Sequence, residues 1–148
     1  KLEDGVAAAT FLAMAGLRRL GMDDIARAPI EPEDMLPAIA QGAIGIEQRA
    51  DDDLVAALLA PIHDGPTGQR LAAERALLAG LDGSCQTPIG GLAELSGDRI
   101  RLRAEILRPD GSECLTHALE GPVSDGAALG RAAAENLRGR AGPNFFEA

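Results

Sequence analysis

The residues best suited to metal or nucleophilic chemistry in this chain are two cysteines and two histidines: Cys85, Cys114, His63 and His117. Cys114 and His117 lie three positions apart in a segment that we expect to be a strand, where side chains at i and i+3 point to opposite faces. This pair therefore cannot hold one ion, and no second CxxC or HxxxH motif completes the four ligands of a structural zinc site. We predict no metal site, with Cys114 as a small buried side chain and His117 as a half-exposed one.

Cys85 lies in a stretch rich in turn-forming residues, Leu81–Gly91, which joins an expected helix to an expected strand. Glycine and proline hold loops in fixed, exposed shapes, and proteins often present functional side chains in this way. No histidine neighbours Cys85 in the sequence, so a Cys–His dyad for acyl transfer has little support. From these residues alone two interpretations stay open: a thiol used in chemistry, or a cysteine that only fills a turn.

The cysteine count also bears on the compartment. Two cysteines cannot form a disulfide framework, although a single pair stays open, and the chain opens without the layout of a secretory signal peptide. We therefore expect a reducing compartment, and the cytoplasm in particular. No apolar run approaches the ~20 residues that span a bilayer, so we expect no membrane partner.

Arginine supplies almost all of the positive charge, with thirteen arginines and a single lysine. This bias suits bidentate recognition of carboxylates, although genome composition explains it equally well. The net charge of −9 repels nucleic acid, and a chain without Trp or Tyr has little material for stacking bases. We therefore predict no nucleic-acid partner. Any anion-binding site in this acidic chain must be formed by locally clustered arginines.

The elements that position these residues fall into two groups. In the first, the nearly continuous apolar run at 7–17 predicts a strand buried on both faces, and residues 43–46 predict a second short buried strand with Gln41 and Gly42 at its entrance. A buried strand needs neighbours, so we expect residues 1–36 to be the tail of an α/β domain whose front half lies outside this chain. Three acids at 51–53 then begin a helix that ends at Pro61.

The second group predicts a small α+β domain. A helix at 69–81 follows a start signal at 64–67 and is closed by Gly83; three strands at about 89–95, 99–107 and 113–119 then form an antiparallel meander. In the middle strand, apolar residues alternate with Arg99, Arg101 and Arg103, which predicts one buried and one wet face. A last helix, capped by Ser124 and running to about Arg138, covers the apolar face with Leu129, Ala133 and Leu137.

A long motif surrounds Cys85: ERAL at 74–77, three further residues, then LDGSCQTPIG at 81–90. Two other blocks, LAMAGLRRLG at 12–21 and LPAIAQGAIGIE at 36–47, accompany it in order and spacing. Together they resemble the cofactor-attachment signature and flanking blocks of porphobilinogen deaminases, also called hydroxymethylbilane synthases. The resemblance covers the whole chain and about the second half of the family's polypeptide.

The resemblance implies a transferase of haem biosynthesis that joins four porphobilinogen molecules into hydroxymethylbilane and releases ammonia. It implies a dipyrromethane cofactor attached to Cys85 through a thioether. Ser84, Gln41 and Gly42 would lie at this cofactor. The resemblance assigns Gly16, Arg19 and Arg49 to the substrate and leaves Arg75 open between substrate binding and a surface charge. The family's catalytic aspartate belongs to the N-terminal half, which would be this chain's partner, so we expect the chain alone to be inactive.

The resemblance also implies an α/β plus α+β fold: the tail of an α/β domain pair like that of periplasmic binding proteins, followed by the small α+β domain. Residues 1–42 would end the second α/β domain, residues 43–62 would return to complete the first, and residues 63–148 would form the cofactor-attachment domain. Two alternatives stay open. One is a non-catalytic module that binds an anion or small molecule with Cys85 unmodified, and the other is a scaffold that docks partners through its sheet edge.

Overall fold

The computed structural model describes residues 2–84 and 86–147, which fall into two compact units, Lys1–Glu31 and Pro32–Ala148. Each unit is described by itself. None of the described helices is long and apolar enough to cross a membrane. The expected domain boundaries at 42/43 and 62/63 stay predictions.

The first unit contains helix α1, Met14–Leu20, followed by a 3₁₀ turn, Asp23–Ile25. Gly21 ends α1 in the left-handed conformation, with φ of 65°. The strand predicted at 7–17 is wrong: residues 7–13 form no strand, and Phe11 is 75% exposed. The physical reason is that a strand buried on both faces depends on paired neighbours, and the described residues supply none to this segment.

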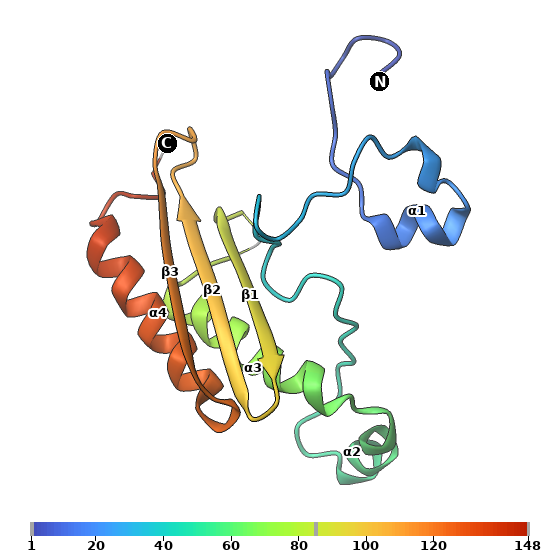
Figure 1. Ribbon diagram of the computed structural model, residues 1–148. Coiled ribbons are helices and arrows are strands. Elements are labelled where there is room, and N and C mark those ends of the chain that lie inside the picture. Colours follow the sequence, from blue (N-terminus) through green and yellow to red (C-terminus); the bar gives the residue numbers. More distant parts are fainter. Residues whose placement is uncertain (1, 85, 148) are drawn as a thin grey trace. The chain divides into compact units, whose positions relative to one another are not determined.

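The second unit is built on a three-stranded antiparallel sheet in the order β1-β2-β3 (Figure 1). The strands are β1, Ile89–Ser96, β2, Arg99–Leu107, and β3, Cys114–Pro122. A two-residue turn joins the first pair, because Ser96 pairs with Arg99, and Gly97 at φ 61° supplies the left-handed conformation that such turns need. The predicted meander is confirmed.

Two helices pack on one face of this sheet: α3, Gly65–Gly80, and α4, Gly126–Ala141 (Figure 1). The alternation predicted for the middle strand is confirmed, since its inward-facing residues are at most 1% exposed: Ile100, Leu102, Ala104 and Ile106. These strand residues pack with side chains of both helices and of the C-terminal segment in one hydrophobic core. The core includes Leu77, Leu102, Ile106, Ala133, Leu137 and Phe145. This sheet-and-helix body is the α+β domain that the sequence predicts.

The ends of the two helices differ in part from the sequence-based expectation. The Asp64 carboxylate accepts a hydrogen bond from the Thr67 N–H at 2.8 Å and caps α3. At the other end, the Gly83 N–H donates to the Leu78 carbonyl at 3.0 Å, but the left-handed residue is Asp82, with φ of 51°. The predicted Ser124 cap of α4 is wrong, because its hydroxyl donates to the neighbouring Asp125 carboxylate instead.

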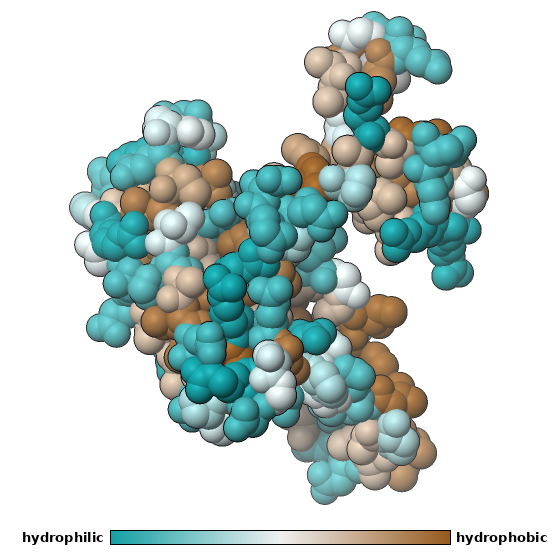
Figure 2. Space-filling model, in the orientation of Figure 1, coloured by the Kyte–Doolittle hydropathy of each residue, from teal (hydrophilic) through white to brown (hydrophobic). Residues whose placement is uncertain are grey.

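Residues 43–62 expose most of their apolar side chains. The strand predicted at 43–46 is wrong, since no strand forms there and Ile44 is 94% exposed. The predicted helix is confirmed as α2, Asp53–Leu59, capped by Asp52, and Pro61 lies in the 3₁₀ turn that follows. Leu54 and Leu58 of α2 are both exposed, and apolar surface gathers over this part of the molecule in Figure 2.

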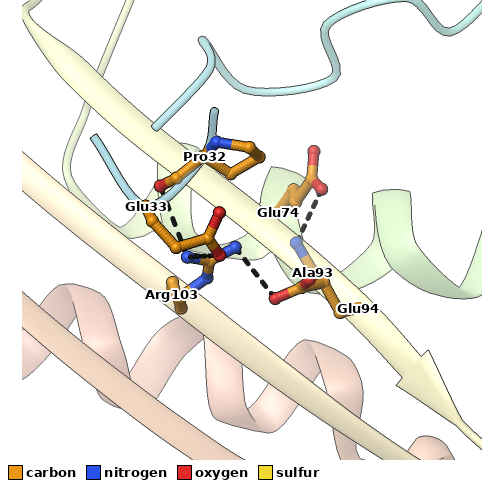
Figure 3. Close-up of polar contacts among 6 residues, drawn as sticks. All are labelled: Pro32, Glu33, Glu74, Ala93, Glu94 and Arg103. Atoms are coloured by element: carbon orange, nitrogen blue, oxygen red, sulfur yellow. Dashed lines mark hydrogen bonds and ion pairs between the residues drawn. The ribbon is translucent and has the colours of Figure 1, made fainter. Parts of the chain in front are cut away.

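A segment of residues 32–42, which we call the strap, lies against the sheet and covers part of its outer face. The Arg103 guanidinium donates to the Pro32 carbonyl at 3.3 Å and forms ion pairs with Glu33 and Glu94, each at 3.1 Å (Figure 3). The Arg103 side chain is only 15% exposed as a result. The predicted wet face is therefore correct for Arg99 and Arg101 but wrong for Arg103.

The close approach of α3 and α4 depends on Gly130. A Cβ atom at this position would overlap the Ala73 carbonyl oxygen and lie 2.8 Å from the Ala76 Cβ, whereas a Cβ at Gly139 of the same helix meets nothing within 4 Å. We expect Gly130→Ala to destabilise the chain by about 1–3 kcal/mol through overpacking. Gly139→Ala should stabilise it by up to ~1 kcal/mol, since alanine favours helix more than glycine does. Urea unfolding measures both, and equal stability of the two variants would contradict the packing described.

Candidate functional site

The buried carboxylate of Glu74 connects three segments of the second unit. Glu74 lies on α3 and is 6% exposed. One carboxylate oxygen accepts the Ala93 N–H of β1 at 2.9 Å, and the other accepts the Ala40 N–H of the strap at 2.9 Å; Figure 3 shows the bond to Ala93. Burial of a carboxylate is costly, and these two charge-assisted bonds offset that cost. The bond to Ala40 also holds a non-glycine residue at φ 61°, in the left-handed region.

Two glycines at the start of β1 allow the strap to approach the sheet. The Gly91 N–H donates to the Pro37 carbonyl at 2.9 Å, and Ala38 forms an antiparallel bridge with Gly90. A Cβ at Gly91 would overlap the Ile39 side chain. The strap is therefore fixed on β1 by its backbone and on α3 by Glu74, just before the position where it reaches the candidate residues at 41–42.

Gln41 and Gly42, which the sequence assigns to the cofactor, line a groove of about 520 Å³ bounded by the strap, α3 and β1. Both residues are exposed, and Gly42 has φ of 80°, a conformation that side chains disfavour. The groove is lined by Ala40, Gln41, Gly42, Ala43, Thr67, Arg70, Leu71, Glu74, Leu92, Ala93, Glu94 and Leu95.

The loop between α3 and β1 is held by its own polar side chains. The Ser84 N–H donates to the Thr87 hydroxyl at 3.0 Å, the Gln86 N–H donates to the Ser84 hydroxyl at 3.2 Å, and the Thr87 N–H donates to the Ser84 carbonyl at 3.1 Å. Asp82 at the start of this loop forms an ion pair with Arg138 of α4 at 2.5 Å. Cys85, the predicted attachment residue, lies outside the described residues.

The structure places the candidate arginines on exposed surfaces. Arg49 is 80% exposed and forms an ion pair of 2.6 Å with Asp52, whose other oxygen caps α2. Arg75 is exposed on α3. Gly16 and Arg19 are exposed on α1, in the first unit, and are described with that unit alone. Of the predicted site residues, only Gln41 and Gly42 are seen to share one described groove.

The burial predicted for Cys114 and His117 is observed for only one of the two side chains. Cys114 is exposed, so its prediction as a buried side chain is wrong, whereas His117 is half-exposed as predicted. Desolvation raises the pKa of the Cys114 thiol, and the charge of Glu105 raises it further. A raised pKa keeps this thiol protonated at neutral pH and makes it a poor nucleophile. The described residues contain no group of three metal-ligating side chains placed to hold an ion.

Sequence reasoning missed the role of Glu74 in the site. An acidic residue next to Ala73 and three positions before Leu77 lies on the buried stripe of its helix, and this position is the signal that could have indicated a buried, hydrogen-bonded carboxylate. The sequence also did not single out Arg70, which lines the groove beside the strap, because nothing local distinguishes it from the other arginines on exposed helix faces.

The chain matches two models of one protein family. Residues 1–57 match the model described as "Porphobilinogen deaminase, dipyromethane cofactor binding domain", and residues 69–139 match "Porphobilinogen deaminase, C-terminal domain". Among curated proteins, the chain is 65% identical to the porphobilinogen deaminase of Paracoccus denitrificans over 147 residues, which are 99% of this chain and 47% of that protein. It is 51% identical over 146 residues to the porphobilinogen deaminase of Nitrobacter hamburgensis, covering 99% of this chain and 46% of that protein.

These matches first define the chain as part of a cofactor-dependent enzyme of tetrapyrrole biosynthesis. It belongs to the porphobilinogen deaminase family and spans about half the length of the curated relatives. The family resemblance and the dipyrromethane cofactor expected from it are confirmed. The α+β domain with its three-stranded sheet corresponds to the family's C-terminal domain.

Removal of the Glu74 carboxylate should loosen the strap from the sheet. We expect Glu74→Ala to lower the free energy of unfolding by about 1–3 kcal/mol, because two backbone N–H groups lose their acceptors. Glu135→Ala is the matched control: Glu135 is exposed on α4, and its loss should change stability by less than ~0.5 kcal/mol. Hydrogen exchange at Ala40 and Ala93 adds a local measurement, and unchanged protection at both amides in Glu74→Ala would contradict this role.

Proposed function

We propose that this chain is the cofactor-bearing part of a porphobilinogen deaminase that joins four porphobilinogen molecules into hydroxymethylbilane and releases ammonia. The observation that carries this proposal is the 65% identity to a porphobilinogen deaminase over 99% of the chain. The motif at 81–90, with Cys85 at its centre, adds the residue-level support. The activity belongs to the full-length enzyme, and the chain alone is inactive because the family's catalytic aspartate lies in the other half.

Cys85 is the attachment residue in this proposal. A thiolate is a strong nucleophile, and the thioether that it forms is stable enough to survive repeated turnover. The bound dipyrromethane supplies the pyrrole carbon from which the product chain grows. The other cysteine is a poor competitor, because the raised pKa of Cys114 keeps its thiol protonated.

The residues present fit a cofactor and substrate that carry many carboxylates. Each pyrrole ring bears an acetate and a propionate, and these charges need neutralising partners as they leave water. Gln41 and Gly42 border the groove beside α3 and β1, where an amide and exposed backbone can donate to a ligand oxygen. Ser84 positions the attachment loop through its bonds to Gln86 and Thr87.

Arginines then bind the substrate carboxylates. Arg49 is exposed and already oriented by the half-buried Asp52, and a substrate carboxylate can replace this partner while the second oxygen of Asp52 continues to cap α2. Arg19 and Gly16 contribute from α1, whereas Arg75 on α3 stays open between substrate binding and a surface charge. A cytoplasmic location and the three-part domain division at 42/43 and 62/63 belong to the same proposal.

The cofactor attachment is tested by intact mass and peptide mapping of the full-length enzyme. We expect a dipyrromethane adduct on Cys85 in the wild type and in Cys114→Ser, and none in Cys85→Ser, since a serine hydroxyl is a much weaker nucleophile at neutral pH. Cys85→Ser should also lose hydroxymethylbilane formation. Active wild-type enzyme with a free Cys85 would contradict the attachment, whereas inactive full-length enzyme with a free Cys85 would favour the alternative of an unmodified, non-catalytic binding module.

Loss of the candidate substrate arginines should impair chain growth. In the full-length enzyme, we expect Arg19→Leu and Arg49→Leu each to reduce kcat/KM for porphobilinogen by roughly tenfold to hundredfold, because each removes one charge-assisted carboxylate contact. The control is Arg101→Leu, since Arg101 is exposed on β2 and should be close to neutral. Wild-type kinetics in both test variants would show that Arg19 and Arg49 are ordinary surface charges with no role in substrate binding.

A further inference from the structure

The groove beside the strap contains one positive and two negative side chains among the residues described: Arg70, Glu74 and Glu94. Both acids already have partners. Glu74 accepts two backbone N–H groups, and Glu94 forms an ion pair of 3.1 Å with Arg103 (Figure 3). The Glu74 oxygens are therefore satisfied by two backbone N–H groups of the groove itself, and Glu94 is paired with Arg103, which does not line the groove. Neither acid forms an ion pair with Arg70 among the described residues.

Arg70 is exposed on α3 and forms no ion pair within the described part of the chain. The charge of Arg70 acts on Asp64: hydrogen bonds from Thr67 lower the pKa of Asp64, and the charge of Arg70 lowers it further. The Asp64 carboxylate is occupied by the helix cap, where it accepts the Thr67 N–H at 2.8 Å. The guanidinium thus keeps its five N–H donors for an anion that enters the groove.

The part of the groove formed by the strap is fixed by hydrogen bonds within the chain. Ala40 is bonded to Glu74, and the Gly91 N–H to the Pro37 carbonyl, so the strap delivers Gln41 and Gly42 to a set place. A groove of about 520 Å³ has room for a pyrrole ring with its side chains, since ligand pockets commonly measure about 300–1,000 Å³. A side-chain amide and an unpaired guanidinium that line the same groove are suited to binding a carboxylate.

We propose that Arg70 is a further substrate-binding residue, which holds an acetate or propionate carboxylate of the pyrrole chain in the groove that Gln41 also lines. The inference rests on the proposed function and adds a binding residue to it. Arg70 is distinguished from other exposed arginines by its place, because it is the one arginine that lines this groove among the described residues.

The test compares three variants of the full-length enzyme: Arg70→Gln, Arg70→Lys and, as control, Arg131→Gln. Arg131 is an exposed arginine of α4 that lines none of the described grooves. Steady-state kinetics with porphobilinogen give KM and kcat, and intact mass shows which chain lengths accumulate on the enzyme. Thermal unfolding reports stability in parallel.

We expect Arg70→Gln to lower kcat/KM roughly tenfold to hundredfold, with one partly grown chain length accumulating and the melting temperature unchanged. Arg70→Lys should recover a large part of the loss, since it restores the charge without the bidentate geometry. Arg131→Gln should behave as the wild type.

Three results would overturn the proposal: wild-type kinetics and chain-length distribution in Arg70→Gln, an equal loss in Arg131→Gln, or a loss that follows a lowered melting temperature and is not recovered by lysine. A wild-type enzyme that converts no porphobilinogen would instead overturn the proposed function, and this inference with it. The two failures are therefore distinguished by the wild-type measurement.

Discussion

The two hydrogen bonds accepted by Glu74 are the constraint on which the arrangement of the candidate site depends. They join residues 34 and 19 positions apart in the chain to one helix, and they do so with a carboxylate that is almost fully buried. An ionised group in such a place is tolerated only when its oxygens are satisfied. The strap, the first strand and α3 are therefore interdependent: each supplies part of the environment that the other two need.

The α+β domain could be predicted from the sequence because its signals are local. Alternation in β2, a two-residue turn with Gly97 and the Asp64 cap each act over a few residues, and the structure has all of them. The strands expected at 7–17 and 43–46 failed for the opposite reason. Apolar runs show that a segment favours burial, but whether it becomes a strand depends on partners that lie elsewhere.

The candidate site could be predicted only in part. The motif indicated which residues matter, but Gln41 meets α3 through contacts that no local pattern contains, since Glu74 and the Gly90–Gly91 pair become partners of the strap only in the folded chain. Burial of Arg103 has the same origin: alternation correctly placed it on the outer face, and a distant segment then covered that face. The face on which a side chain lies can be predicted from the periodicity and propensity of its segment, whereas the position of a groove depends on tertiary contacts between distant segments.

The close packing of α4 on α3 at Gly130 makes the domain mechanically stiff. The Ala73 carbonyl occupies the space where a side chain at position 130 would lie, so no layer of side chains separates the two helices there. The side chains between the helices and the sheet are almost inaccessible to solvent. Interiors packed to this density transmit displacement and do not absorb it. A force applied to this domain is therefore expected to leave its helix-and-sheet body unchanged and to displace the segments attached to it.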